Sequence, residues 1–402
     1  SRYAEPHREC LRKVLPAFLE KVEPAPGIQK SAPLSAQTSM LITFEPPHTK
    51  DHATDYLKKI KDALAQGAHV CILVAEEVAA RYFEEAYVEF KPLFYSSSLS
   101  LKKQKEAWQT AISAKPHLLI CTRSGLFLPF KKLGLLIIDD ESNEAYKSDM
   151  SPRYNAADIA PDIARIHGAE CLISATVPRL ETIYRLGLAP QAPRVKATIV
   201  DMVWEIKSAN FSPLSRYVQD QLYNNAEDKK LSVLFVPHRG YATTTVCPKC
   251  GQTVKCTQCS TPLVAHADGS MRCHRCGLRT AKPKACAICG AYGLKAHGVG
   301  IEKAEQAVKN LFSRANLSVP PLWRFDSDET KNKDAYERKI IESWQASGNG
   351  ILIATHILFS YQWLLNVPFI GILEAETTSH FPDFRADERL VRQMCILGSM
   401  AD

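Results

Sequence analysis

The sequence has no long apolar segment, because its longest apolar runs are only about one β-strand in length. A membrane-spanning helix needs about 20 mostly apolar residues, so we expect no membrane span and no membrane partner. The first ten residues, SRYAEPHREC, also lack the apolar core of a secretory signal peptide. We therefore expect a cytoplasmic protein whose cysteines stay reduced.

Glycine is scarce, at 18 of 402 residues, where about 7% is average. This low content disfavours the glycine-rich loops that wrap phosphate groups. The 12 histidines show no H-x-x-x-H or comparable metal spacing, and the chain has no internal repeats or low-complexity tracts. Histidine-based metal sites and repeat architectures are therefore not expected.

Cysteine, in contrast, is concentrated in one short stretch. Eight of the 13 cysteines form four C-x-x-C pairs: Cys247/Cys250, Cys256/Cys259, Cys273/Cys276 and Cys286/Cys289. Two such pairs complete a tetrahedral Cys₄ zinc site, so four pairs predict two closed zinc sites with no ligand left over. A disulfide framework is the weaker alternative, since the other five cysteines are scattered singly.

The cysteine-rich stretch is also basic. Residues 247–290 carry seven lysines and arginines against one acid, Asp268. Each zinc with four thiolates has a formal charge of −2, so two sites reduce the block's charge from +6 to about +2. The remaining positive charge suits contact with phosphates or acidic partners. A solvated surface that keeps a small module soluble is the alternative.

A chain of this length predicts two or three domains. Apolar strands expected at 41–44, 69–75, 117–122, 133–139 and 170–176 alternate with helices expected at 51–67, 76–89 and 100–114. A second series has strands at 195–201, 231–237, 319–325, 350–355 and 369–375, and helices at 212–226, 301–314 and 333–346. The fold class is therefore α/β, with two doubly wound lobes and a cysteine-rich insertion in the second.

The expected boundaries follow from this pattern. An N-terminal helix and linker occupy residues 1–39, lobe 1 covers 40–190, and lobe 2 begins at 191–244. The zinc-binding module covers 245–297, and 298–402 is the remainder of lobe 2, which we expect to be truncated.

Several strings resemble a known family when taken in order. They are TRSGLFLPFKKLGLLIIDDES (122–142), YKSDMSPRYNAADIA (146–160), SATVPRLE (174–181), FVPHRGYATTTVCPKCG (235–251), GVGIEKAEQ (298–306) and FPDFRADER (381–389). They resemble the helicase core of the replication-restart DNA helicases, the PriA or primosomal protein N′ family. The resemblance implies two RecA-like lobes, an ATP-dependent 3′-5′ DNA helicase, and replication-restart proteins as partners.

The family also implies a nested arrangement of the cysteines. Cys247, Cys250, Cys286 and Cys289 would hold zinc 1, and Cys256, Cys259, Cys273 and Cys276 would hold zinc 2. Joining the first pair to the second across five residues is possible but sterically tight.

The residues depart from the family where ATP would be hydrolysed. The expected phosphate loop reads EPPHTKDHAT (45–54), with no glycine and two prolines, and Lys50 or His52 falls near the expected lysine. Asp139 stands at the Walker B aspartate, and Asp140 replaces the glutamate that orients water. No arginine follows Arg392, where motif VI would supply an arginine finger. These departures place ATP and magnesium in doubt as cofactors; the alternative for Asp139 and Asp140 is a polar strand end.

The resemblance places the loop 143–155 in the DNA channel. Tyr146 and Tyr154 could stack on unpaired bases while Lys147 and Arg153 hold phosphates, and Arg239 is a similar candidate. The alternative is that both tyrosines pack against a neighbouring helix.

Two functional hypotheses follow. The first is a replication-restart protein that binds single-stranded or forked DNA, in an active form that hydrolyses ATP or in the form we favour, with its ATPase lost or weak. The second is a non-catalytic, zinc-stabilised scaffold that binds DNA or proteins.

Overall fold

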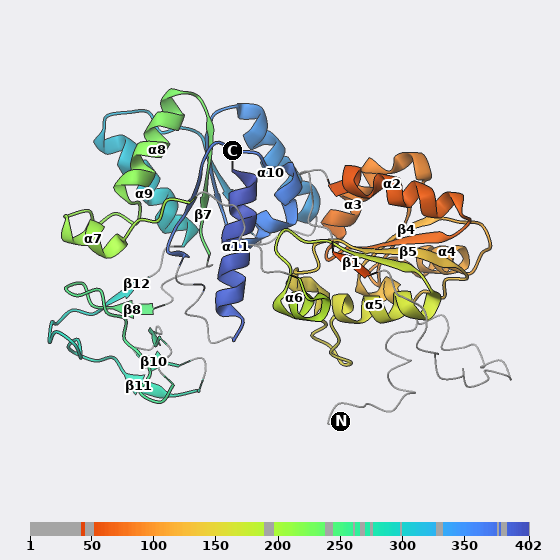
Figure 1. Ribbon diagram of the computed structural model, residues 1–402. Helices are drawn as coiled ribbons and strands as arrows, with labels where there is room; N and C mark the ends of the chain where they lie inside the picture. The colour runs from red at the N-terminus through yellow and green to blue at the C-terminus, as the bar shows by residue number, and fades with distance from the viewer. Residues whose placement is uncertain are drawn as a thin grey trace. The chain divides into compact units, whose positions relative to one another are not determined.

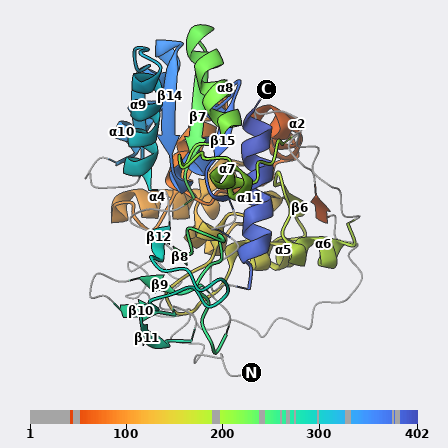
Figure 2. The same cartoon turned by 90° about the vertical axis from the view of Figure 1, so that its left-hand side faces the viewer.

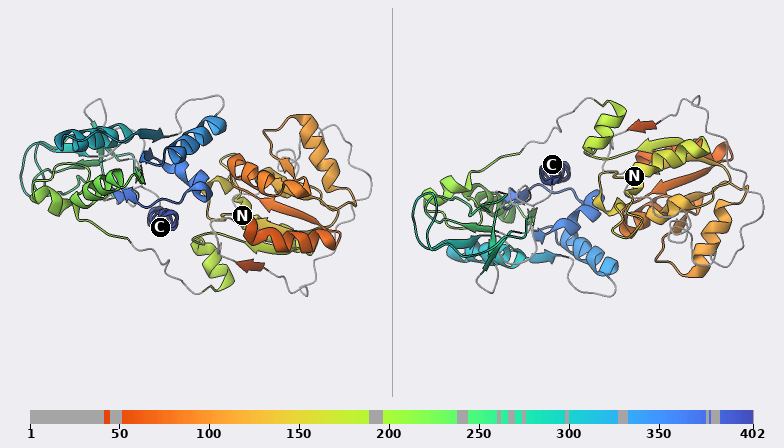
Figure 3. Two further views of the ribbon diagram at one scale, coloured as in Figure 1. Left: turned by 90° about the horizontal axis from the view of Figure 1, so that it is seen from above. Right: turned by 90° about the horizontal axis from the view of Figure 1, so that it is seen from below.

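The computed structural model describes residues 42–44, 52–188, 197–237, 244–259, 262–265, 270–273, 276–297, 300–326, 333–375, 378 and 384–401. The chain divides into two compact units, Ser1–Pro190 and Gln191–Asp402, which we call lobe 1 and lobe 2. Each lobe contains its own main parallel sheet (Figures 1 and 3).

Lobe 1 contains a six-stranded parallel sheet in the order β1-β6-β5-β2-β4-β3. The strands are β1 (Ile42–Phe44), β2 (His69–Leu73), β3 (Leu93–Tyr95), β4 (Leu118–Cys121), β5 (Leu133–Ile138) and β6 (Glu170–Ile173). All residues of β2 and β4 are buried, as expected for strands that helices cover on both faces. Strand β3 was not predicted from the sequence; it is an edge strand whose apolar run, Leu93–Tyr95, is only three residues long.

Helices cover both faces of this sheet. Helices α2 (His52–Ala65) and α3 (Glu77–Ala86) pack through one apolar cluster, which includes Tyr56, Ile60 and Phe83. Helices α4 (Leu101–Ala111) and α5 (Ala156–His167) pack through a second cluster against the other face, and α6 (Leu180–Leu186) follows β6 (Figure 1). Lobe 1 is thus doubly wound, as the sequence predicts.

Lobe 2 contains a four-stranded parallel sheet in the order β13-β14-β7-β15. Its strands are β7 (Leu231–Phe235), β13 (Leu322–Phe325), β14 (Gly350–Ala354) and β15 (Ile370–Ile372). Helices α8 (Arg216–Glu227) and α9 (Ile301–Arg314) share an apolar cluster with β7 and β14 (Figure 2), and α10 (Lys333–Ser347) contacts β13 and β14. The cysteine-rich segment lies between β7 and α9 in the sequence, so it is an insertion in this lobe.

The strand expected at 195–201 is wrong over the residues that the structure describes. Residues 197–200 form no strand, and the side chain of Ile199 is 85% exposed. Asp201 instead caps the short helix α7 (Met202–Lys207), where its carboxylate accepts hydrogen bonds from the amides of Val203 at 2.8 Å and Trp204 at 3.3 Å. An N-cap aspartate favours a helix start over continuation of a strand.

Among the described residues, none of the helices combines the length and apolar character that crossing a bilayer demands.

Gly125 provides a test of the packing in lobe 1. A Cβ atom at this position would lie 2.2 Å from the Cβ and 2.7 Å from the sulfur of Cys121. We expect Gly125→Ala to lower the free energy of unfolding by about 1–3 kcal/mol through overpacking. Ser124→Ala, one residue away, is the matched control, because the buried Ser124 hydroxyl has no hydrogen-bond partner in the described structure. Thermal unfolding of both variants checks this; an unchanged melting temperature for Gly125→Ala would contradict the packing.

Candidate metal centres and nucleic-acid interface

The eight paired cysteines gather into two groups of four. Within each group, the sulfur atoms all lie within 4.8 Å of one another. We call Cys247, Cys250, Cys286 and Cys289 the outer group, and Cys256, Cys259, Cys273 and Cys276 the inner group. These are the two sets that the nested arrangement requires, and the structure does not join the first pair to the second.

The sulfur spacing fits a tetrahedral metal ion. In the outer group, the sulfurs of Cys247 and Cys289 are 3.6 Å apart and those of Cys250 and Cys286 are 3.7 Å apart. In the inner group, two sulfur pairs are 3.5 and 3.4 Å apart. Four sulfurs at about 2.3 Å from a zinc ion would be separated by about 3.8 Å, whereas a disulfide requires about 2.05 Å. Each group supplies all four ligands itself, which is typical of a structural rather than a catalytic site.

A glycine follows the second cysteine in three of the four pairs. Gly251, Gly277 and Gly290 have φ angles of 73°, 78° and 68°. Residues other than glycine rarely adopt this left-handed backbone conformation. Their amides donate to the carbonyls of Cys247, Cys273 and Cys286 at 2.9, 3.0 and 2.9 Å. The repeated turn presents both sulfurs of a pair to one point. The C-x-x-C-G pattern is visible in the sequence, although the zinc prediction rested on the cysteines alone.

Backbone amides favour the thiolate form of Cys286, whereas at Cys250 and Cys276 an amide hydrogen bond is outweighed by burial and neighbouring cysteine sulfurs, which raise the pKa values of both to about 12. The amide of Ile288 donates to the Cys286 sulfur at 3.4 Å, and the amide of Gln258 donates to the Cys256 sulfur at 3.4 Å. The amides of Cys289 and Ile288 outweigh burial and lower the pKa of Cys286 to about 6. A thiolate is the form that binds metal, so the turn prepares the ligand for a cation.

Short strands and one valine connect the two groups. Strand β8 (Thr244–Val246) leads into Cys247 and pairs antiparallel with β12 (Lys295–His297), which follows the last cysteine. The inner group is framed by β9 (Val264–Ala265), β10 (Ser270–Arg272) and β11 (Arg279–Ala281). Val254 packs against the apolar cluster of each group. The module is therefore one nested unit rather than two independent knuckles.

In lobe 1, Asp139 and Asp140 follow β5 at the carboxyl edge of the sheet. Asp139 is buried, and its Oδ1 accepts a hydrogen bond of 2.7 Å from the hydroxyl of Tyr56 on α2. Burial and the neighbouring Asp139 raise the pKa of Tyr56 well above its ordinary value, so the phenol remains a donor. One oxygen of the Asp139 carboxylate is thus engaged by a protein hydroxyl.

Asp140 has a left-handed backbone with a φ of 45°, and its carboxylate is turned toward its own loop. Its two oxygens accept hydrogen bonds from Ser142 Oγ at 3.0 Å and Asn143 Nδ2 at 3.4 Å. Aspartate tolerates this backbone region better than most residues because its short polar side chain bonds locally. The structure therefore gives Asp140 a clear role in forming the turn.

Some predicted site residues cannot be placed. Lys50 and Arg239 lie outside the described residues, as does the loop 45–51, and His52 begins α2 with its side chain undescribed. The segment expected to carry motif VI forms helix α11 (Ala386–Met400), whose last residue, Met400, is 2% exposed. The C-terminal end of α11 is therefore buried through the apolar side chain of Met400.

Two of the four contact residues predicted in the loop 143–155 are exposed, and one of them, Lys147, donates from its Nζ to the carbonyl of Arg153 at 3.3 Å. Lys147 and Arg153 are exposed, and the loop doubles back on itself, with the amide of Ser148 donating to the Tyr154 carbonyl at 2.8 Å. Tyr154 is partly buried, and its ring meets Phe127 edge-on at 5.5 Å. Its proposed stacking on a base stays a prediction.

The structure corrects the prediction made for Tyr146. We expected it to be available for base stacking, but its side chain is 0% exposed. Its hydroxyl donates to the backbone carbonyls of Leu73 at 2.9 Å and Asp139 at 2.5 Å. The ring fills the core beneath the loop, which is the alternative that the sequence left open.

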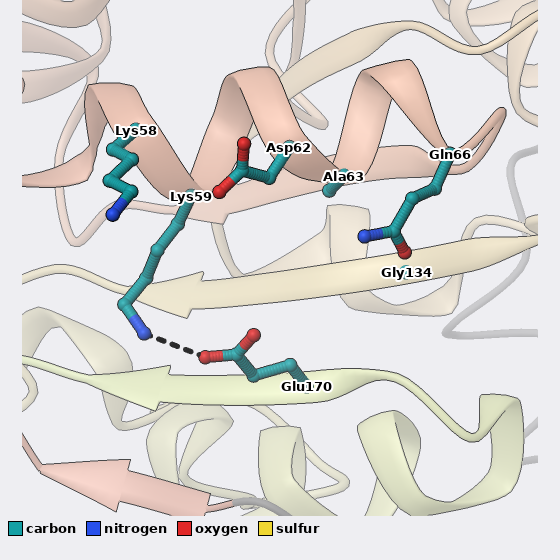
Figure 4. Close-up of a pocket in the computed structure, with 7 residues that line it drawn as sticks. All are labelled: Lys58, Lys59, Asp62, Ala63, Gln66, Gly134 and Glu170. Carbon is teal, nitrogen blue, oxygen red and sulfur yellow. Dashed lines mark hydrogen bonds and ion pairs between the residues drawn. The ribbon is translucent and has the colours of Figure 1, made fainter.

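A polar pocket opens at the opposite, amino edge of the lobe 1 sheet. It is lined by Lys58, Lys59, Asp62, Ala63, Gln66, Gly134 and Glu170. Lys59 crosses it to form an ion pair of 2.8 Å with Glu170 (Figure 4). Because Gly134 and Glu170 lie at the starts of β5 and β6, the pocket is separate from the Asp139 edge.

The chain thus contains two α/β lobes, each built on a parallel sheet, with a double Cys₄ module inserted in the second. The sequence comparisons point to one family: the chain is similar to replication restart protein PriA of several bacteria. It is 29% identical to the Bacillus subtilis (strain 168) protein over 352 residues, covering 83% of this chain and 43% of that protein. It is 31% identical to the Rickettsia prowazekii (strain Madrid E) protein over 362 residues, covering 86% and 55%.

The resemblance inferred from the sequence is thus confirmed, and the chain spans about half the length of the relatives it matches. No family model matches the chain. The crystal structure of the DUF1998 helicase MrfA bound to DNA and AMPPNP aligns with a TM-score of 0.49 at 10% identity, over 88% of this chain and 44% of that chain. A likeness at this level bears on no functional statement.

Loss of one cysteine of the inner group should unfold the zinc-binding module and leave lobe 1 folded. We expect Cys256→Ser to release the inner metal and unfold the module, because metal binding supplies the folding free energy of such small modules. Lobe 1 should keep its own melting transition. Cys171→Ser, in the lobe 1 core, is the control that should keep all bound metal. Metal content and limited proteolysis test this; full metal retention by Cys256→Ser would contradict it.

Proposed function

We propose that this chain is the core of a replication-restart protein that binds single-stranded or forked DNA and has lost most or all of its ATPase activity. The observation that carries the process is the similarity to PriA proteins along more than four fifths of the chain. Each Cys₄ group would hold one zinc ion, which would fix the module's fold. A cytoplasmic location and replication-restart partner proteins belong to the same proposal.

Several features support loss of hydrolysis. The Asp139 carboxylate already accepts the Tyr56 hydroxyl, and Asp140 directs its carboxylate into its own turn. If His52 takes the lysine position, the next residue is Ala53, which has no hydroxyl for a magnesium ion. The segment 392–402, where the family resemblance places motif VI, has no arginine after Arg392, and its Met400 is buried. An arginine finger alone is worth roughly 10³–10⁵ in rate.

Two other functions stay open to test. An active ATP-driven helicase would be favoured if Asp139 still held magnesium. A scaffold that binds only proteins would be favoured if single strands were not bound at all. DNA-stimulated ATP hydrolysis by the full-length natural protein separates the first from our proposal, and binding of an oligonucleotide separates the second.

We expect no tight ATP binding and no appreciable turnover. Calorimetry with ATP and magnesium should show no micromolar site, and single-stranded DNA should not stimulate hydrolysis. The changes at the phosphate loop, at Asp140 and at the arginine finger each remove a separate contribution to positioning or charge stabilisation. Micromolar affinity together with turnover of about 1 s⁻¹ or faster, an ordinary enzyme rate, would establish the active helicase instead.

We expect single-stranded DNA to bind with strong salt dependence through the loop 143–155. The slope of log K against log salt is negative, and removing one phosphate contact reduces its magnitude by about 0.7 for single strands. Lys147→Ala and Arg153→Ala should each show such a decrease. Lys58→Ala, at the amino edge of the sheet, should leave the slope unchanged. Fluorescence anisotropy at several salt concentrations measures this, and unchanged slopes for both loop variants would reject the assignment.

A further inference from the structure

One arginine connects both ends of the loop 143–155. Arg179, in the segment after β6, is 8% exposed. Its Nε donates to Glu141 Oε2 at 2.6 Å, and its Nη2 donates to Asp158 Oδ1 at 2.8 Å. Glu141 precedes the loop and Asp158 follows it on α5, so a single guanidinium bridges the two flanks.

The inner half of this bridge is firmly held. Glu141 is 1% exposed, and its Oε1 also accepts the backbone amide of Arg179 at 2.8 Å. The amide of Glu141 donates to the carbonyl of Ser174 at 2.9 Å. Burial opposes the charged form of Arg179, but Glu141 and Asp158 outweigh it and raise the pKa of Arg179. The planar guanidinium can serve two carboxylates at once, which a lysine cannot do with the same geometry.

Other contacts hold the interior of the segment. Tyr146 is anchored in the core, Arg123 donates to the carbonyl of Lys147, and Asn155 caps α5 through the amide of Ala157 at 2.9 Å. Between these anchors, Lys147 and Arg153 face solvent. What Arg179 adds is a fixed distance between the two flanks.

We propose that Arg179 is a positioning residue that closes the base of the loop 143–155 and thereby sets the spacing of Lys147 and Arg153 for a nucleic-acid backbone. The inference rests on the proposed DNA binding through this loop. Arg179 is nearly inaccessible, so it acts through Glu141 and Asp158 and does not contact phosphate itself.

The test combines two measurements on Arg179→Met. Amide hydrogen exchange reports opening of the loop without any ligand, and anisotropy with a single-stranded oligonucleotide reports affinity and salt slope. We expect faster exchange across 143–155. If the competent loop is then populated one tenth of the time, the Kd rises about tenfold. The salt slope should not change, because no phosphate contact is lost.

Two further variants keep the test decisive. Asp158→Asn weakens the more exposed half of the bridge, together with a longer ion pair of 3.7 Å to Arg185, and should show smaller changes in the same direction, even if Arg179→Met does not fold. Lys59→Met breaks the ion pair with Glu170 at the other edge of the sheet (Figure 4) and should change neither measurement.

Each outcome has one meaning. Unchanged loop exchange in both Arg179→Met and Asp158→Asn would overturn the inference, as would faster exchange with unchanged affinity. A salt slope lower by about 0.7 in Arg179→Met would show direct phosphate contact and also overturn it. If the parent protein bound no oligonucleotide, the proposed function would fail, and so would the positioning of Lys147 and Arg153 for DNA. The exchange data would still decide whether Arg179 closes the base of the loop.

Discussion

Strands β5 and β6 pair in parallel, with Ile138 opposite Ile173, so the segments that follow them begin side by side. This places Glu141 and Arg179 within hydrogen-bonding distance although 38 residues separate them. Because Glu141 is buried, removal of Arg179 would take away its ion-pair partner, whereas Arg179 would still pair with Asp158 if Glu141 were lost. The turn at Asp140 directly precedes Glu141, and the loop 143–155 and the start of α5 lie along the chain between Glu141 and Arg179.

At the same edge of the sheet, both aspartates after β5 are engaged by neighbouring side chains of lobe 1. Asp139 and Asp140 direct their carboxylates toward Tyr56, Ser142 and Asn143. These contacts are complete within the protein, and so is the Arg179 bridge. Side chains of lobe 1 itself therefore hold the turn that leads into the loop.

The cysteine-rich module is governed by a different constraint. Its strands are two or three residues long, and its apolar clusters contain few residues besides the cysteines. So little buried surface does not support folding of a small domain without added cross-links or metal. Left-handed glycines and amide-to-sulfur hydrogen bonds bring the thiolates together, and a cation at each centre would supply the missing stabilisation.

Much of this protein could be read from its sequence. The C-x-x-C spacing fixes which residues can be ligands, and continuous apolar runs mark the buried parallel strands, because both are local properties of the chain. Tertiary structure decided the rest. Tyr146 and Tyr154 look equivalent in sequence, yet only Tyr146 is fully buried, because its hydroxyl reaches the ends of β2 and β5. Likewise, Arg179 bridges Glu141 and Asp158 only because parallel pairing brings distant segments to one edge of the sheet.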